Sequence, residues 1–341
     1  MVKKLIKIVS VVWIIVMTLA IGISYYYNSS VKNPLKNLKA PVTIEIKVGD
    51  NISTIISRVD SKADISNSFI VKYYAKSHSQ NIKINAGYLF VVQPGMTTRD
   101  ILNAIANAVP KDPNAVKVTI VEGTTIDDIA KVLETKGIIS SKDFIDAVKK
   151  YKLPAYVKSD SKRRYALEGF LYPDTYYMDK NSKGNDVIKI LLGNFEKKLQ
   201  DAQKETGIVL GDDEVDKIVT LASMIESEVK APNERPIVSS VFTNRLKLGM
   251  TMGSDATIQY ALGVHKEQLT EADTKINSPY NTYVVAGLPE GPICNPRKES
   301  IEAAMNPAQT KYLFFFAKKD GTHVFSETYE QHLAAASKYG K

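Results

Sequence analysis

The sequence has a single cysteine, Cys294, among 341 residues. One thiol cannot form an internal disulfide, so the fold must be stabilised by its hydrophobic core. The chain is long enough to bury a sizeable core and to form two or three domains. Its composition, 44% hydrophobic and 24% charged, is ordinary for a globular protein.

Concentrated positive charge is also absent. The formal charge of +8 comes from lysines spread along the chain, without a basic block or an alternation of basic and aromatic residues. Such patterns accompany nucleic-acid binding, so we expect no nucleic-acid partner. A mildly basic surface favours an anionic polymer or an anionic membrane surface, or it serves solubility alone.

The sequence gives little support for metal chemistry or for a serine nucleophile. Its four histidines show no HExxH spacing, and one cysteine adds no metal-binding cluster. They are His78, His265, His323 and His332. A G-x-S-x-G elbow is also missing. We expect no metal site and no cofactor.

One long hydrophobic run is present, from Leu5 to Ile23. At ~1.5 Å per residue it spans about 28 Å, close to the thickness of a bilayer core. Lysines precede the run and Tyr25–Tyr27 follow it, which predicts a membrane anchor over residues 1–27 with a cytoplasmic N-terminus and an extracytoplasmic remainder. The alternative is a cleaved signal peptide, because Ala20-Ile-Gly22 loosely resembles a cleavage site.

A repeated unit follows a short polar stalk over residues 28–41. Gly49, Gly95 and Gly123 each lie between an alternating strand pattern and a helix pattern that opens on Ser, Thr or Asn. Two of the three copies continue into a second helix, over 66–76 and 140–151. Residues 42–155 therefore suit a small binding module, although a spacer whose repeats only pack on each other fits equally.

Residues 159–341 predict a helix-rich α+β domain. The expected helices cover about 185–205, 215–229, 234–248, 254–261, 298–305 and 329–339, and strands are expected at 312–317 and 322–326.

Glu226 is the most unusual residue of this domain. Its helix carries apolar residues at alternating three- and four-residue steps, and Glu226 projects along that stripe, whereas Glu228 falls off it. A buried carboxylate is costly unless it is paired or stays protonated, the second being the state that a general acid needs. An ion pair with Arg235 or Arg245 is the alternative.

The chain resembles the endolytic murein transglycosylases of the MltG, or YceG-like, family. The resemblance rests on segments in order along most of the chain. They are Glu168-Gly-Phe-Leu-Tyr-Pro-Asp-Thr-Tyr176, Leu221-Ala-Ser-Met-Ile-Glu226-Ser-Glu228, Val241-Phe-Thr-Asn-Arg-Leu246, Ser254-Asp-Ala-Thr-Ile-Gln-Tyr260, Tyr280-Asn-Thr-Tyr283, Gly287-Leu-Pro-Glu-Gly-Pro-Ile-Cys-Asn-Pro296 and His323-Val-Phe-Ser326. The sequence departs from the family's pattern at Glu290, where a second Pro is frequent, and at Val229, where Thr is common.

The resemblance implies a LysM-like repeat module and a lytic transglycosylase domain. The implied substrate is the glycan of peptidoglycan, cut between N-acetylmuramic acid and N-acetylglucosamine to leave a 1,6-anhydro end. It places the catalytic acid, which then acts as base, on Glu226. Substrate contacts are expected among polar and aromatic residues of the shared segments, although turn or capping roles suit them as well. They are Glu168, Gln259, Tyr280, Asn281, Tyr283, Asn295 and His323.

Glu168 has the further alternative of an ion pair with Arg163 or Arg164, and Asp255 is expected in the first turn of its helix. An anchor would place the cut near the membrane, where peptidoglycan-synthesising enzymes work. The rival interpretation is a membrane-anchored protein that binds peptidoglycan as a scaffold without catalysis.

Overall fold

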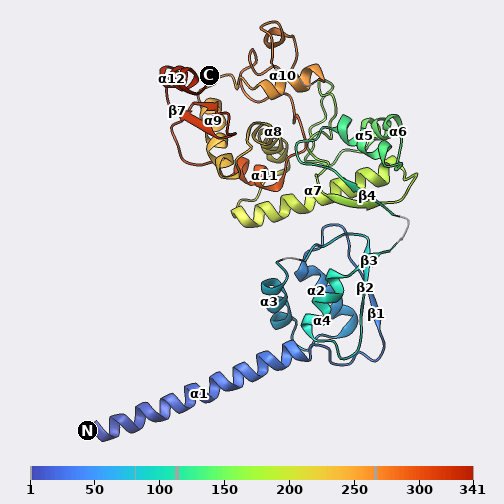
Figure 1. Cartoon of the computed structure of the whole chain (residues 1–341), viewed down its shortest axis with the longest axis vertical. Helices are drawn as coiled ribbons and strands as arrows, with labels where there is room; N and C mark the ends of the chain where they lie inside the picture. The colour runs from blue at the N-terminus through green and yellow to red at the C-terminus, as the bar shows by residue number, and fades with distance from the viewer. Residues whose placement is uncertain (1, 81, 112–114, 265, 267, 341) are drawn as a thin grey trace. The chain divides into compact units, whose positions relative to one another are not determined.

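The computed structural model describes residues 2–80, 82–111, 115–264, 266 and 268–340, with side chains from Trp13 onward. The chain forms two compact units, residues 1–115 and residues 116–341 (Figure 1). Each is described by itself below, as unit 1 and unit 2.

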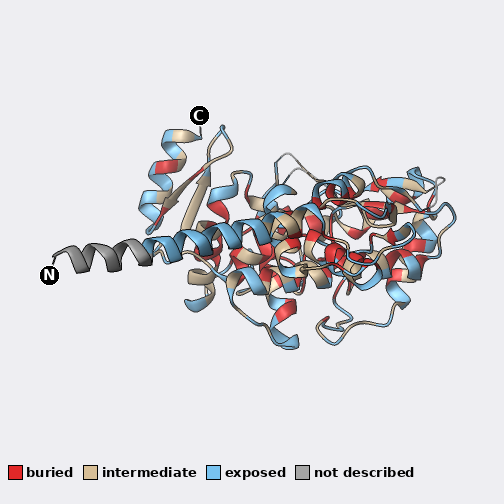
Figure 2. Cartoon of the chain, turned by 90° about the horizontal axis from the view of Figure 1, so that it is seen from below, coloured by how far each residue is buried: buried red, intermediate tan, exposed pale blue. Residues whose placement is uncertain are grey.

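Unit 1 begins with the long helix α1, Val2–Lys32. The part from Trp13 to Lys32 is long and apolar enough to cross a membrane, and its side chains are exposed over most of that length (Figure 2). The helix continues to Lys32, into the segment that we expected to be a stalk, because residues 28–32 keep helical hydrogen bonding such as Asn33 N–H to Ser29 O.

The rest of unit 1 packs helices on a small antiparallel sheet. The strands are β1 (Val42–Glu45), β2 (Tyr88–Val92) and β3 (Val109–Pro110), in the order β1-β2-β3 with Val42 opposite Val92. The helices are α2 (Ile52–Ala63), α3 (Ser68–His78) and α4 (Thr98–Ala106). Isoleucines of β1 and α2 and Phe90 of β2 form the buried core.

Unit 2 contains the third strand-glycine-helix repeat. We expected all three repeats to form one module over 42–155, followed by a separate domain from residue 159. The repeat consists of β4 (Val116–Thr119), α5 (Ile126–Thr135) and α6 (Ser141–Lys150). Strand β4 pairs with β5 (Thr175–Met178), and α6 packs on α7 (Gly184–Thr206). The division falls between residues 115 and 116 because these contacts bind the repeat into the larger core.

The predicted repeats are confirmed as local structure. Gly49, Gly95 and Gly123 adopt φ values of +80°, +80° and +78°, which side chains rarely tolerate. Asn51, Thr97 and Thr125 then cap α2, α4 and α5 by accepting a backbone N–H.

The remaining elements of unit 2 confirm the predicted helices and the last two strands. They are α8 (Asp212–Glu228), the 3-10 turn η1 (Pro232–Glu234), α9 (Arg235–Lys247), α10 (Asp255–Leu262), the 3-10 turn η2 (Asp273–Lys275), α11 (Lys298–Met305), β6 (Phe314–Ala317), β7 (His323–Ser326) and α12 (Tyr329–Tyr339). The result is a mixed helix and sheet fold, as expected.

Helix α8 is the centre of unit 2. Every residue from Val219 to Ile225 is buried, because α9, α10 and α11 all pack against α8. A helix buried on all sides carries no single buried stripe. Its C-terminal turn, with Glu226 and Glu228, therefore meets different neighbours on different faces.

Candidate functional site

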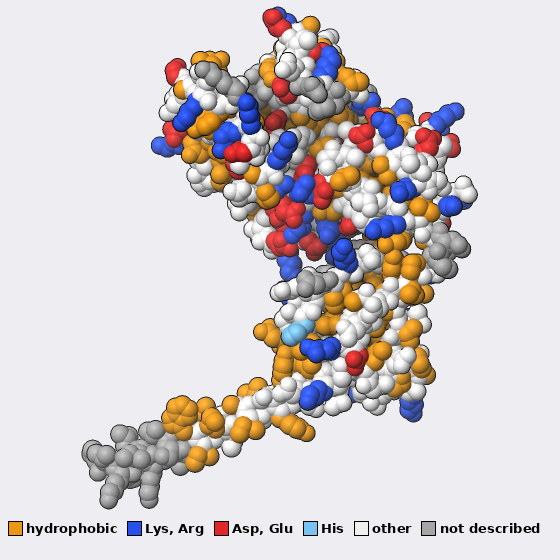
Figure 3. All heavy atoms as spheres, in the orientation of Figure 1, with side chains coloured by type: hydrophobic (Ala, Val, Ile, Leu, Met, Phe, Trp, Pro, Cys, Tyr) orange, Lys and Arg blue, Asp and Glu red, His pale blue; other side chains and the backbone are white. Residues whose placement is uncertain are grey.

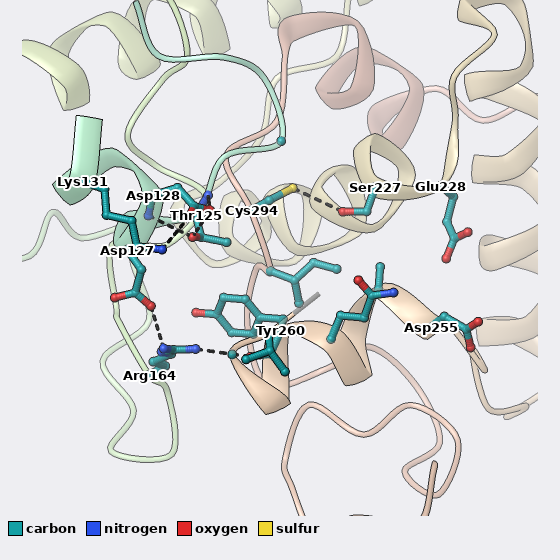
Figure 4. Close-up of a pocket in the computed structure, with 16 residues that line it drawn as sticks. Thr125, Asp127, Asp128, Lys131, Arg164, Ser227, Glu228, Asp255, Tyr260 and Cys294 are labelled. Atoms are coloured by element: carbon teal, nitrogen blue, oxygen red, sulfur yellow. Dashed lines mark hydrogen bonds and ion pairs between the residues drawn. The ribbon is translucent and has the colours of Figure 1, made fainter. Parts of the chain in front are cut away.

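Unit 2 contains a cavity of about 740 Å³ beside the C-terminal turn of α8 (Figure 4). This volume lies in the range of small-molecule binding sites. The lining residues come from α5, α8, α10 and from loops before α5, before β5 and after α10: Gly123, Thr125, Asp127, Asp128, Lys131, Arg164, Ser227, Glu228, Asp255, Ala256, Gln259, Tyr260, Gly263, Val264, Ile293 and Cys294.

Glu228, the last residue of α8, supplies a carboxyl group at one end of the cavity (Figure 4). Its Oε1 accepts a hydrogen bond of 2.6 Å from the Ser254 hydroxyl. Burial raises the pKa of Glu228 above its usual value, and the negative charge of Asp255 raises it further. Glu228 is thus a carboxyl group that faces a cavity and tends to keep its proton.

Asp255 lies at the same end, in the first turn of α10. Its Oδ1 accepts a hydrogen bond from the Tyr283 hydroxyl. Tyr283 is 39% exposed, so this pair lies at the rim of the site. Two carboxyl groups therefore share one end of the cavity, and the negative charge of Asp255 is one of the causes of the raised pKa of Glu228.

The other end of the cavity carries two ion pairs built on α5 (Figure 4). Arg164 Nη2 lies 2.6 Å from Asp127 Oδ2, and Lys131 Nζ lies 3.3 Å from Asp128 Oδ1. The ring of Tyr260 lies between the two ends in Figure 4. The cavity thus joins an acidic end to an end where charges are balanced, with an aromatic ring between them.

Glu226 points to another part of unit 2. Its carboxylate accepts hydrogen bonds from Arg297 Nε at 2.8 Å and from the Ser300 hydroxyl at 2.7 Å, at the start of α11. Its side chain is 4% exposed, and it is not among the described residues that line the cavity. The alternative of a buried ion pair therefore describes Glu226, although the partner is Arg297 and not Arg235 or Arg245. The prediction that Glu226 lies in the cleft as the acid is not supported by this geometry.

A comparison with protein families decides the ancestry of the chain. The model of the YceG-like family matches residues 44–338, which is most of the sequence. The chain belongs to the YceG-like family.

Two curated relatives bear the name endolytic murein transglycosylase. The Bacillus subtilis (strain 168) protein is 33% identical over 338 residues, covering 94% of this chain and 91% of that protein. The protein of Streptococcus pneumoniae serotype 2 is 29% identical over 322 residues, covering 87% of this chain. The match covers 58% of the pneumococcal protein, so this chain spans a little over half of that length.

A solved structure has the same fold. The crystal structure of a yceG-like protein from Listeria monocytogenes matches with a TM-score of 0.58 at 30% identity. The match covers 87% of this chain and 99% of the Listeria chain.

In this YceG-like chain, only some of the other residues predicted to contact substrate line the cavity. Gln259 of α10 lines the cavity. Asn281 is fully buried, and its amide donates to the carbonyl oxygens of Thr274 and Ile276, which fixes a loop. His323 is also structural, because its Nδ1 lies 2.7 Å from Glu234 Oε2.

Glu168 and Asn295 form a buried polar cluster behind the cavity. Glu168 accepts hydrogen bonds from the Ile126 N–H at 3.0 Å, the Tyr260 hydroxyl at 3.0 Å and the Asn295 amide at 3.2 Å. Neither predicted ion pair of Glu168, with Arg163 or Arg164, appears among the described contacts: Arg163 pairs with Asp216 and Arg164 with Asp127. Burial raises the pKa of Glu168 to about 8. The cluster positions α5 and Tyr260, and the substrate contact predicted for Glu168 and Asn295 would be indirect.

Tyr280 is buried beside Tyr260, with ring centroids 4.9 Å apart. It lines a smaller hollow next to Lys162 and Arg164. Its hydroxyl has no hydrogen-bond partner among the described residues. Tyr280 therefore supports Tyr260, the residue that reaches the cavity.

The described residues contain no group of three or more His, Cys, Asp or Glu side chains arranged to hold a metal ion. His265, one of the four histidines considered above, lies outside the described residues.

The sequence pattern did not indicate that Glu228 faces a cavity, although it placed Glu228 on the same helix as Glu226. One sequence signal concerns Ser254, which stands at the N-cap position of α10. In the structure its hydroxyl group does not cap α10 but donates a hydrogen bond to Glu228.

Proposed function

We propose that this chain is a membrane-anchored lytic transglycosylase that cuts peptidoglycan glycan strands internally, with Glu228 as the acid and base. Family membership and the name shared by its relatives support the reaction class. The observation that carries the assignment of the residue is the placement of the Glu228 carboxyl group at one end of a cavity of about 740 Å³, where burial raises its pKa.

One carboxyl group is enough for this reaction. Glu228 donates its proton to the oxygen that links N-acetylmuramic acid to N-acetylglucosamine, and the bond from that oxygen to C1 of the muramic acid breaks. The 6-hydroxyl of the same muramic acid then attacks C1 and gives its proton to the Glu228 carboxylate. The products are a 1,6-anhydro end and a free 4-hydroxyl, and Glu228 is protonated again.

A muramidase that uses water is the second candidate, because Asp255 shares the acidic end of the cavity with Glu228. Glycosidases of that kind need two carboxyl groups. Asp255 accepts the hydrogen bond of Tyr283 and its charge raises the pKa of Glu228, so we assign it the role of tuning the acid.

The chain outside this site has supporting roles in the proposal. Helix α1 would anchor the protein with its N-terminus in the cytoplasm and the rest outside. The strand-helix repeats of residues 42–155 would act as a LysM-like module, in which the third copy is part of the catalytic unit. Peptidoglycan-synthesising enzymes remain candidate partners.

Mass analysis of glycan ends tests the proposal. Purified protein incubated with peptidoglycan should yield 1,6-anhydro ends, and Glu228→Gln should lower the rate by about two orders of magnitude or more. Reducing ends instead of anhydro ends would establish a muramidase, and no cleavage by the intact protein would favour the scaffold.

Glu226→Gln is the matched control, since it changes the same functional group two residues away. We expect it to retain activity whenever it folds. The assignment to Glu228 fails if Glu226→Gln is inactive while folded and Glu228→Gln remains active.

A further inference from the structure

Helix α3 exposes an aromatic and basic face. Phe69 and Tyr73, one helical turn apart, are 79% and 65% exposed. Lys72 and Lys76 are spaced in the same way and flank the two rings, whereas Val71 and Ala75 are buried on the opposite side. The helix contains no acidic residue. We call these four residues, Phe69, Lys72, Tyr73 and Lys76, the α3 face.

The α3 face begins next to the apolar helix α1. Asn67, the N-cap of α3, donates from its side-chain amide to the Tyr26 hydroxyl of α1 at 3.1 Å. The Ser66 N–H donates to Pro34 O at 2.7 Å, just after α1 ends. α1 and α3 are packed against each other, and Figure 1 shows α3 beside the C-terminal end of α1.

If α1 crosses the membrane, as proposed above, the hydrogen bond to Tyr26 sets the level of α3 relative to the bilayer. Tyr25, Tyr26 and Tyr27 follow the apolar run of α1, and tyrosines in that position lie at the headgroup level of a membrane. The start of α3 is therefore held at the same level. Phe69 and Tyr73 follow within two turns, where aromatic rings partition into the interface and lysines reach anionic headgroups.

We propose that the α3 face lies in the outer surface of the anionic bilayer that α1 crosses. The two rings would be buried among the headgroups, and Lys72 and Lys76 would contact lipid phosphates. Figure 3 shows hydrophobic and basic side chains together on this side of unit 1, with little acidic surface between them. Unit 1 would thus have a fixed orientation on the membrane instead of turning freely about α1.

Site-directed fluorescence tests this proposal on the full chain. Tyr73→Cys would be labelled with an environment-sensitive dye, and the protein reconstituted into nanodiscs of phosphatidylcholine with phosphatidylglycerol. Cys294 is 2% exposed, and unsubstituted protein measures any background labelling. Val109→Cys is the matched control, because Val109 is 60% exposed in β3, away from α1 in Figure 1.

We expect lipids with a shallow nitroxide to quench the dye at position 73, and aqueous iodide to quench it severalfold less than the dye at position 109. Adding Lys72→Glu and Lys76→Glu should restore iodide quenching at position 73. Equal iodide quenching at positions 73 and 109, or failure of the chain to float with vesicles, would overturn the proposal.

Discussion

At the scale of single residues, Glu226 and Glu228 show how two positions on one helix acquire different roles. Glu226 holds the start of α11 through Arg297 and Ser300. Arg297 is 33% exposed, so solvent weakens this ion pair, and a glutamine can still accept the hydrogen bond of Ser300. We expect Glu226→Gln to lower the free energy of unfolding by about 1–3 kcal/mol, measured by urea denaturation. A variant as stable as the parent would mean that the pair does not hold α11.

A second residue-scale prediction concerns Asp255. Its negative charge raises the pKa of Glu228, so Asp255→Asn should lower that pKa, while the amide oxygen still accepts from Tyr283. In the proposed mechanism Glu228 must be protonated to donate, so activity should be lost as the pH rises through its pKa. The alkaline limb of the pH–rate profile should therefore move to lower pH in Asp255→Asn. An unmoved limb with lower activity throughout would indicate direct participation of Asp255.

The sequence pattern favoured Glu226 as the catalytic acid, whereas the cavity leads us to propose Glu228, two residues further along the same helical turn. A single apolar stripe favoured Glu226 because it lies along that stripe. In the structure every residue from Val219 to Ile225 is buried, so the stripe does not distinguish the face that packs on α11 from the face that opens to the cavity. That distinction depends on Ser254 and Arg297, which are distant in the sequence.

At the scale of elements, local patterns predicted most of unit 2. Helices α7 to α12 were expected from periodicity and caps, and they lie within a few residues of the predicted bounds. Strand β5, Thr175–Met178, was not predicted, because a four-residue strand with two tyrosines has little periodicity to read. Because β5 pairs with β4, the third repeat belongs to unit 2 and not to unit 1.

The element-scale prediction concerns the junction of α5 with α10. Glu168 links the first N–H of α5 to Tyr260 of α10, and burial raises its pKa to about 8. The folded chain keeps a proton that the unfolded chain releases, so this group reduces stability as the pH rises from about 4.5 to about 8. Glu168→Gln should reduce this decline, measured by urea denaturation at several pH values.

Glu271→Gln, at an exposed position, is the control for that series. It should follow the parent at every pH. An equal pH dependence in Glu168→Gln and the parent would mean that Glu168 is ionised in the folded chain, in which case the junction does not depend on a protonated carboxyl group.

At the scale of the whole molecule, the position of the boundary decides which fragment can fold. Residues of the third repeat, among them Val118, Ile126 and Phe144, belong to the same buried core as α7 and α8. Repeats of similar local sequence therefore belong to two different units. Only their tertiary contacts determine to which unit each repeat belongs.

We therefore expect residues 116–341 to fold alone and residues 159–341 to fail. The shorter fragment loses β4, α5 and α6, which exposes the apolar surface of α7 and removes the α5 side of the cavity. Circular dichroism should show one cooperative thermal transition for 116–341 and none for 159–341. Cleavage of peptidoglycan by 116–341, abolished by Glu228→Gln, would place the whole chemistry in this unit. A cooperative transition in 159–341 would contradict the prediction, because it would show that the core of unit 2 folds without the third repeat.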